Sequence, residues 1–113
     1  MPYIEKLADR IRIALENTPK VEEKKMFRGL TFMVDGKMCI SVNAEGIMAR
    51  VDPEMHERLL DEKPCRAVMM RGREYKGFIR VNEEDLGTNR ALNFWIGLCL
   101  EYNPKAKASK KKH

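Results

Sequence analysis

The chain has 113 residues, of which 43% are hydrophobic and 35% are charged, a composition typical of one soluble domain with a single core. No apolar run approaches the roughly 20 residues of a membrane span, and the N-terminus shows no secretory pattern, so we expect a cytoplasmic protein with no membrane association. The formal net charge is +5, but residues 104–113 contain five lysines and no acid. Residues 1–103 therefore form a formally neutral predicted domain, and residues 104–113 a predicted disordered basic tail.

The first expected element is an amphipathic helix over residues 3–16, whose apolar residues recur at helical spacing. Ile13 lies off this apolar stripe, so we expect it to be exposed or to contact a second partner, and Asn17-Thr18-Pro19 ends the helix. A short strand is expected over residues 21–27. Its charged run, Glu22 to Lys25, suits a solvated sheet edge.

Residues 26–51 predict three consecutive antiparallel strands, around which the rest of the domain is organised. Asp35-Gly36 is a two-residue hairpin signal, because both central positions of a type I′ turn need a positive φ. When the strands are paired from this turn and from the longer turn at residues 43–46, one face is a core face: Thr31, Met33, Met38, Ile40, Val42, Ile47, Ala49 and Val51. The other face is too apolar to be simply solvated, so we expect a helix or a second subunit to cover it: Leu30, Phe32, Val34, Cys39, Ser41, Met48 and Arg50.

The C-terminal half predicts two more strands and two more helices. Asp52-Pro53 opens a short acidic helix to about residue 60, and strands follow at residues 66–70 and 75–81. Thr88 caps a last helix over residues 89–102, whose nearly all-round apolar surface indicates burial on several sides or contact with another chain. The predicted fold is α+β: an antiparallel sheet of about five or six strands with a β-meander core, an N-terminal helix, a short middle helix and a long C-terminal helix.

Candidate chemistry is sparse, and we predict no enzyme, no metal and no cofactor. His56 is expected on the surface of the acidic helix; the alternative is a general base beside Glu57 or a metal ligand, which needs three or four convergent ligands. Cys65, beside Arg66, is the best candidate nucleophile, since a neighbouring cation lowers a thiol pKa. Cys39 and Cys99 are expected in the core. A small enzyme that uses Cys65 or His56 is the third functional hypothesis.

A basic segment over residues 66–80 follows an acidic segment over residues 52–62, and the two could attract each other within the chain or between subunits. Arginines bind phosphates and aromatic rings stack on bases, so direct nucleic-acid binding by this segment and the lysine tail, weak and salt-dependent, is the second hypothesis. The alternative is a solvated hairpin whose Tyr75 and Phe78 turn inward. The eight methionines could form an adaptable binding surface, but several lie on predicted strands, where filling the core is expected.

Several motifs occur in an ordered series: the N-terminal helix, Met26-Phe27-Arg28-Gly29-Leu30, Asp35-Gly36-Lys37-Met38, Ala49-Arg50-Val51-Asp52, Lys76-Gly77-Phe78 and a last helix with Trp95. Over about residues 3–102 this series resembles the TfoX N-terminal domain family, also called TfoX/Sxy-like. The best-known members of that family regulate natural competence by helping to activate transcription of DNA-uptake genes, and they carry a second, helical domain. We expect this chain to be a stand-alone member without that domain. The resemblance implies no catalytic residues, and the matching positions are expected to form turns or to fill the core: Phe27, Gly29, Gly36, Gly77, Phe78 and Trp95.

The leading hypothesis is therefore a non-enzymatic bacterial domain that acts through protein–protein contacts in a regulatory setting, as a homodimer and with an unidentified protein partner. The predicted interaction surface comprises Leu30, Phe32, Val34, Met48, Arg71, Arg73, Tyr75 and Lys76.

Overall fold

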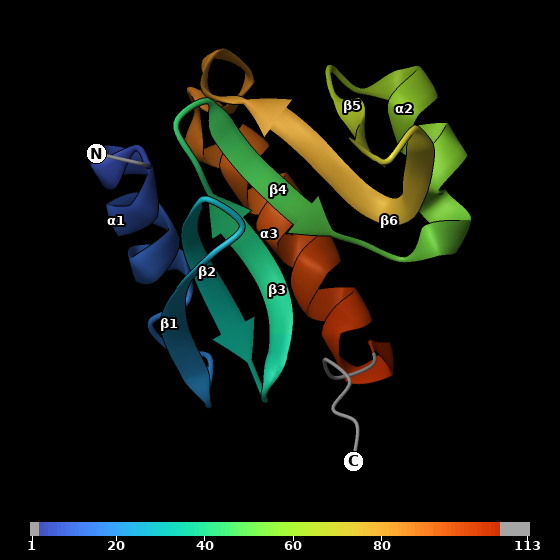
Figure 1. Cartoon of the computed structure of the whole chain (residues 1–113). Coiled ribbons are helices and arrows are strands. Elements are labelled where there is room, and N and C mark those ends of the chain that lie inside the picture. The colour runs from blue at the N-terminus through green and yellow to red at the C-terminus, as the bar shows by residue number, and fades with distance from the viewer. Residues whose placement is uncertain (1–2, 107–113) are drawn as a thin grey trace.

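The computed structural model describes residues 3–106, which form the predicted α+β fold (Figure 1). Six antiparallel strands make one sheet in the order β1-β2-β3-β4-β6-β5. The strands are β1 (Val21–Met26), β2 (Gly29–Val34), β3 (Lys37–Val42), β4 (Gly46–Arg50), β5 (Arg66–Met70) and β6 (Arg73–Asn82). The helices are α1 (Glu5–Ala14), α2 (His56–Glu62) and α3 (Asn89–Tyr102), with short 3-10 turns η1 (Pro53–Met55), η2 (Glu83–Leu86) and η3 (Asn103–Lys105).

The helix ends follow the capping residues predicted from the sequence. The Thr88 hydroxyl accepts a hydrogen bond from the Ala91 backbone N–H at 3.1 Å, so α3 begins directly after it. The Asp52 carboxylate accepts from the Glu54 N–H at 3.0 Å and starts η1, which continues into α2. No helix among residues 3–106 is long and apolar enough to cross a membrane.

Helices α1 and α3 cover one face of the sheet. Figure 1 shows α3 running across the sheet and α1 next to the end formed by β1 and β2. Leu7 and Ile11 of α1 and Trp95 of α3 pack with Phe32 of β2 in the main core. Each of these four side chains is buried, so this helix-covered face supplies most of the hydrophobic stabilisation.

The register between β2 and β3 differs from the predicted register. Met33 pairs with Met38, as the Asp35-Gly36 turn requires, but Phe32 pairs with Ile40. Cys39 is therefore an extra residue in β3, a β-bulge. A shift of one residue transfers every following side chain to the opposite face.

The predicted division of the meander into two faces is consequently wrong for β2 and for Met38, whereas the predicted core face is confirmed for Ile40, Val42, Ile47, Ala49 and Val51. Leu30, Phe32 and Val34 join Ile40 and Val42 on the helix-covered face and are at most 6% exposed. Their cover is supplied by helices of the same chain, one of the two possibilities that the sequence left open. They cannot belong to an interaction surface of the folded domain.

The edge strand β1 is solvated, as predicted, since its four central residues are exposed. The Arg12 guanidinium of α1 donates to both carboxylate oxygens of Glu23, at 2.7 and 2.9 Å. This contact lowers the pKa of Glu23 below its ordinary value. The Arg12–Glu23 ion pair therefore connects α1 to the edge strand β1.

At the C-terminal end, the Asn103 side-chain amide donates to the Val34 carbonyl at 3.2 Å. Pro104 and Lys105 complete η3, and Ala106 is 8% exposed. Residues 107–113, which make up the rest of the predicted tail, lie outside the described residues.

Candidate functional site on the open face of the sheet

The face of the sheet opposite α1 and α3 carries a second apolar cluster. Met33, Met38, Met48 and Val68 are its buried members, and Met26 and Phe78 pack against them. Among the described residues, none from a helix belongs to this cluster. We call this surface the open face.

A groove of about 250 Å³ lies on the open face. It contains four of the six large hydrophobic side chains that are exposed among the described residues, namely Phe27, Met69, Met70 and Tyr75, at 44–58% exposure. An exposed apolar patch of this kind typically marks an interaction site. The lining residues are Phe27, Arg28, Met48, Val68, Met69, Met70, Tyr75, Phe78 and Arg80.

Arginine is the charged residue of the groove. Arg28 and Arg80 line it, and no acidic residue does. The Arg50 guanidinium lies over the Phe78 ring, 5.5 Å from its centre, in a cation–π contact. Among residues 3–106, none of these three arginines takes part in an ion pair. The groove therefore joins an apolar lining to arginines that form no ion pair among the described residues, and Glu45 is the acidic residue of an adjoining hollow that Arg28 and Arg80 also line.

The structure brings together only some of the predicted interaction residues. Met48 and Tyr75 line the groove. Arg71 and Arg73 are exposed at the turn between β5 and β6. Lys76 pairs with Glu57 of α2 at 2.7 Å, which realises within the chain the attraction expected between the acidic and basic segments.

Seven groove residues are absent from the predicted interaction surface: Phe27, Arg28, Val68, Met69, Met70, Phe78 and Arg80. Phe27 was expected in the core as a family-like aromatic residue, but it is 45% exposed. The sequence signal for this groove is the pair Met69-Met70 at the exposed end of a hairpin. Neighbouring side chains of a strand point to opposite faces, so only one of these two methionines can face the main core.

His56 is fully buried, so its predicted surface position is wrong. Its Nδ1 accepts a hydrogen bond from the Gly77 N–H at 3.0 Å, and its Nε2 lies 2.6 Å from the Glu74 carboxylate. An imidazole nitrogen that accepts a backbone N–H carries no proton. The proton of the neutral ring is therefore on Nε2, which donates to Glu74.

These contacts hold a bend in β6. Residues 76–78 have no partners in β5, because Ala67 pairs with Ile79 while Val68 pairs with Tyr75. Gly77 has φ +91°, and its carbonyl accepts from the Val51 N–H at 2.8 Å. Figure 1 shows β6 curling strongly at its start. The His56 ring thus satisfies the backbone N–H that the bulge removes from the sheet.

The same geometry disfavours a metal centre. His56, Glu57 and Glu74 are the one group among the described residues with ligand atoms close enough for a metal, within 4.8 Å of one another. A metal-bound histidine normally donates its second N–H to an acceptor, whereas Nδ1 here faces the Gly77 N–H. The donor set does not fit a cation, and the fully buried ring is closed to a substrate.

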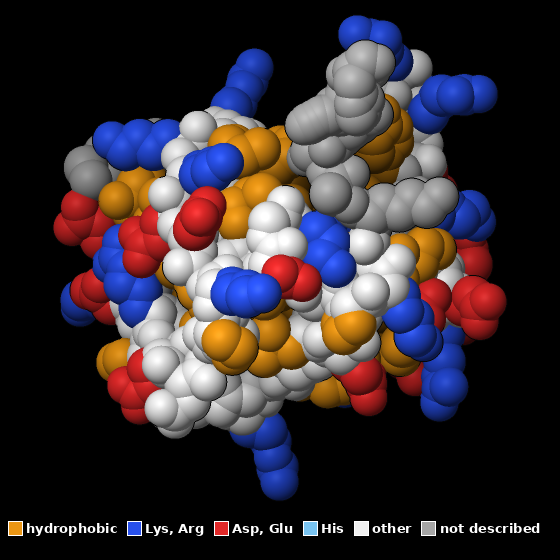
Figure 2. Space-filling view, turned by 90° about the horizontal axis from the view of Figure 1, so that it is seen from below, with side chains coloured by type: hydrophobic (Ala, Val, Ile, Leu, Met, Phe, Trp, Pro, Cys, Tyr) orange, Lys and Arg blue, Asp and Glu red, His pale blue; other side chains and the backbone are white. Residues whose placement is uncertain are grey.

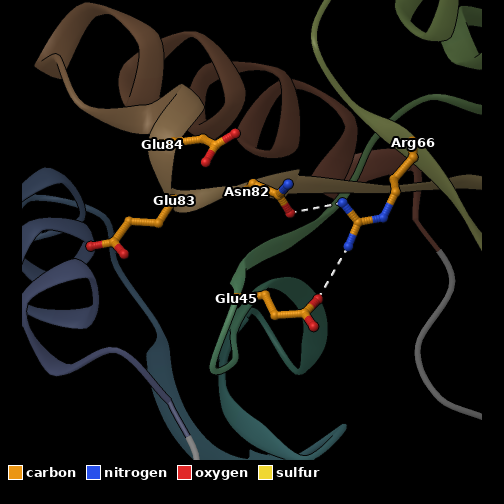
Figure 3. Close-up of a pocket in the computed structure, with 5 residues that line it drawn as sticks. All are labelled: Glu45, Arg66, Asn82, Glu83 and Glu84. Atoms are coloured by element: carbon orange, nitrogen blue, oxygen red, sulfur yellow. Dashed lines mark hydrogen bonds and ion pairs between the residues drawn. The ribbon is translucent and has the colours of Figure 1, made fainter.

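Cys65 lacks the features of an activated nucleophile. It is half-buried, its thiol donates to the Leu59 carbonyl at 3.3 Å, and burial raises its pKa. The neighbouring Arg66 points elsewhere: its guanidinium donates to Asn82 at 2.7 Å and to Glu45 at 3.1 Å (Figure 3).

Cys39 and Cys99 are buried in the main core, as predicted. Burial raises the pKa of the Cys99 thiol. Its hydrogen bond to Cys39 lowers the pKa of that neighbour, but both sulfurs are closed to solvent.

A second hollow, of about 450 Å³, surrounds Arg66. Its other lining residues are Glu45, Asn82, Glu83 and Glu84, and Figure 3 shows Glu83 pointing away from the arginine. Because Arg66 is already bonded to Glu45, this hollow offers no free cation to an anionic ligand. Figure 2 likewise shows acidic and basic side chains intermixed on the surface seen from below, so this surface carries no large patch of a single charge.

The sequence pattern of the TfoX N-terminal domain matches residues 14–102. The chain belongs to the TfoX N-terminal domain family. No curated protein and no solved structure matches it.

Several motifs of this TfoX N-terminal domain now have a physical explanation. Asp35 and Gly36 both have positive φ, as the type I′ turn requires. Gly77 forms the bulge of β6, and Trp95 is buried in the main core. Phe27 and Phe78 belong instead to the open face.

Proposed function

We propose that this TfoX N-terminal domain is a non-catalytic regulatory module that binds a protein partner through the open face. The exposed apolar groove, which holds four of the exposed large hydrophobic side chains, carries the proposal. Membership in a competence and regulatory type of family supports the regulatory setting.

The non-catalytic part rests on the state of the candidate groups. Both ring nitrogens of His56 are engaged and the ring is fully buried. Burial raises the pKa of Cys65, which opposes thiolate formation at neutral pH. The His56 ring is closed to a substrate, and the half-buried Cys65 thiol is not activated.

Site-specific photo-crosslinking tests the partner. A photoreactive amino acid replaces Met69, which is 58% exposed beside the groove, and the matched control replaces Ile13, which is 67% exposed on α1. In cells that naturally express the protein, we expect a protein adduct of defined mass from position 69 and none from position 13. Equal labelling from both positions, or adducts with nucleic acid alone, would refute the proposal.

The homodimer remains a separate prediction with less support than the sequence suggested. Leu92, Trp95, Ile96 and Cys99 of α3 are buried within their own chain, so the apolar surface of α3 no longer demands a second subunit. Phe94 is 37% exposed, with the Lys63 ammonium 4.4 Å from its ring centre. Light scattering at micromolar concentrations decides the question, and a strict monomer would end the prediction.

Direct nucleic-acid binding is the second candidate function, because arginines and exposed aromatic rings share the open face. A salt titration of DNA and RNA binding, with and without residues 104–113, tests it. If the full chain does not bind either nucleic acid at low salt, this candidate is eliminated.

A further inference from the structure

We propose that the groove binds an acidic segment of the partner protein, anchored by one or two large apolar side chains. This inference rests on the proposed function and specifies the chemistry of the partner.

The shape of the groove favours side chains as occupants. Its volume of about 250 Å³ lies below the roughly 300–1,000 Å³ of typical small-molecule sites. Among its lining residues, Met48 and Val68 are buried and Phe78 is partly buried, whereas Met69, Met70 and Tyr75 are exposed. Methionine side chains are flexible and polarisable, so such a surface adapts to different apolar anchors.

The charge of the groove favours an acidic segment around those anchors. Arg28 and Arg80 line it without any carboxylate among the lining residues, and neither forms an ion pair within residues 3–106. Guanidinium groups bind carboxylates in bidentate geometry. Aspartate or glutamate beside the apolar anchor would therefore complement both features.

A second copy of the chain is a poorer occupant. A symmetric contact between two open faces would bring the arginines of one face, Arg28, Arg50 and Arg80, towards the arginines of the other, and like charges across an interface are unfavourable. A contact between the groove and an acidic surface of another copy is heterologous, and such contacts tend to build open chains instead of closed dimers.

A single-stranded nucleic acid is also less well matched. The rings of Tyr75 and Phe78 are inclined at 58° with centres 6.2 Å apart, so they do not form a flat platform for successive bases. Three of the nine lining residues are methionines, which offer no planar face for stacking.

Fluorescence anisotropy with a panel of synthetic peptides tests the inference on the full chain. The panel peptides carry Leu, Phe or Trp anchors among Asp and Glu residues. One control series replaces the acids with Lys, a second replaces the anchors with Ala, and an oligo-dT strand provides the nucleic-acid probe.

We expect the acidic anchored peptides to bind and both control series to bind about tenfold more weakly or not at all. Tyr75→Ala and Arg28→Glu should each weaken binding by about five- to tenfold. The matched controls Ile13→Ala and Arg90→Glu alter exposed residues of α1 and α3 and should leave affinity unchanged. The urea midpoint of each variant reports folding, and Met69→Ala replaces Tyr75→Ala if the latter does not fold.

Four outcomes would overturn the inference. Three concern the probes: no binding by any acidic anchored peptide, equal binding of the Lys series, or preferential binding of oligo-dT. The fourth is self-association that Tyr75→Ala abolishes, because the occupant would then be a second copy. A protein adduct from position 69 together with failure of the acidic panel would leave the proposed function standing and remove only this inference.

Discussion

Replacing His56 with leucine tests the interpretation that this buried ring holds the bend of β6. Leucine keeps apolar volume in the site but leaves the Gly77 N–H without its acceptor, now 3.0 Å away. An unsatisfied buried donor costs about 1–3 kcal/mol. The lost Glu74 contact adds up to about 1 kcal/mol, because the Glu74 side chain is 37% exposed and can turn to water.

The expected loss of unfolding free energy is therefore about 1–4 kcal/mol. For a domain of this size, that corresponds to a fall in Tm of roughly 10 °C. Urea denaturation measures the free energy, and hydrogen exchange followed by NMR measures protection of the Gly77 amide. His56→Leu should lose that protection selectively before the sheet as a whole opens.

Two further variants separate the two hydrogen bonds. His56→Asn places a side-chain oxygen near the position of Nδ1, so it should recover part of the Gly77 bond and fall between wild type and His56→Leu in stability. Glu74→Gln retains an acceptor for Nε2–H and should cost less than about 1 kcal/mol. The reasoning is refuted if His56→Leu is as stable as wild type, or if the Gly77 amide stays protected in it.

Three other predictions concern the backbone, the edge of the sheet and the thiols. Gly77→Ala should lower the free energy of unfolding by about 2 kcal/mol, because φ is +91° and the new Cβ would lie 3.1 Å from the Val51 carbonyl oxygen. The control Gly97→Ala lies on α3 with no atom near the new Cβ, and it should instead raise the free energy of unfolding by about 0.5–1 kcal/mol. Glu23→Gln should lower the free energy of unfolding by less than about 1 kcal/mol at pH 7. Because Arg12 lowers the folded pKa of Glu23 below 4.5, the contribution is complete above that ordinary value and is lost as the pH falls through the lower folded pKa. A difference that does not diminish as the pH is lowered would contradict the assignment. Alkylation of Cys65 at pH 7, followed by mass spectrometry, should be slower than that of a free cysteine, because burial raises its pKa; faster modification would reopen the enzyme hypothesis.

Much of the fold could be predicted from local chemistry. The Asp35-Gly36 turn, the Thr88 cap and the charged edge strand β1 each depend on residues within a few positions of one another. The solvent exposure of Ile13, at 67%, likewise follows from its place off the stripe of one helix. Such features need no knowledge of which strands pair or which face is covered.

The features that could not be predicted depend on contacts between distant segments. His56 reads as a polar residue in an acidic helix, and its burial follows only from the Gly77 N–H, 21 positions along the chain. The Gly77 N–H is available to His56 because the bulge in β6 removes it from the hydrogen bonding of the sheet. A bulge is marked in the sequence by little more than the glycine itself. A buried polar residue of this kind can be predicted only when the hydrogen-bond partners of both its donor and its acceptor atoms are known.

The bulge at Cys39 also explains why Leu30, Phe32 and Val34 were predicted on the uncovered face. With strict alternation, Leu30, Phe32 and Val34 form an apolar face without a cover, and the methionines of β2 and β3 form a core. The extra residue at Cys39 exchanges these roles, since Phe32 then pairs with Ile40 and faces α3. The methionine face is left open, and the unmatched residues 76–78 of β6 bring Tyr75 opposite Val68 beside it. An apolar groove on this face is therefore a consequence of backbone register, and its arginines are the feature that packing alone does not require.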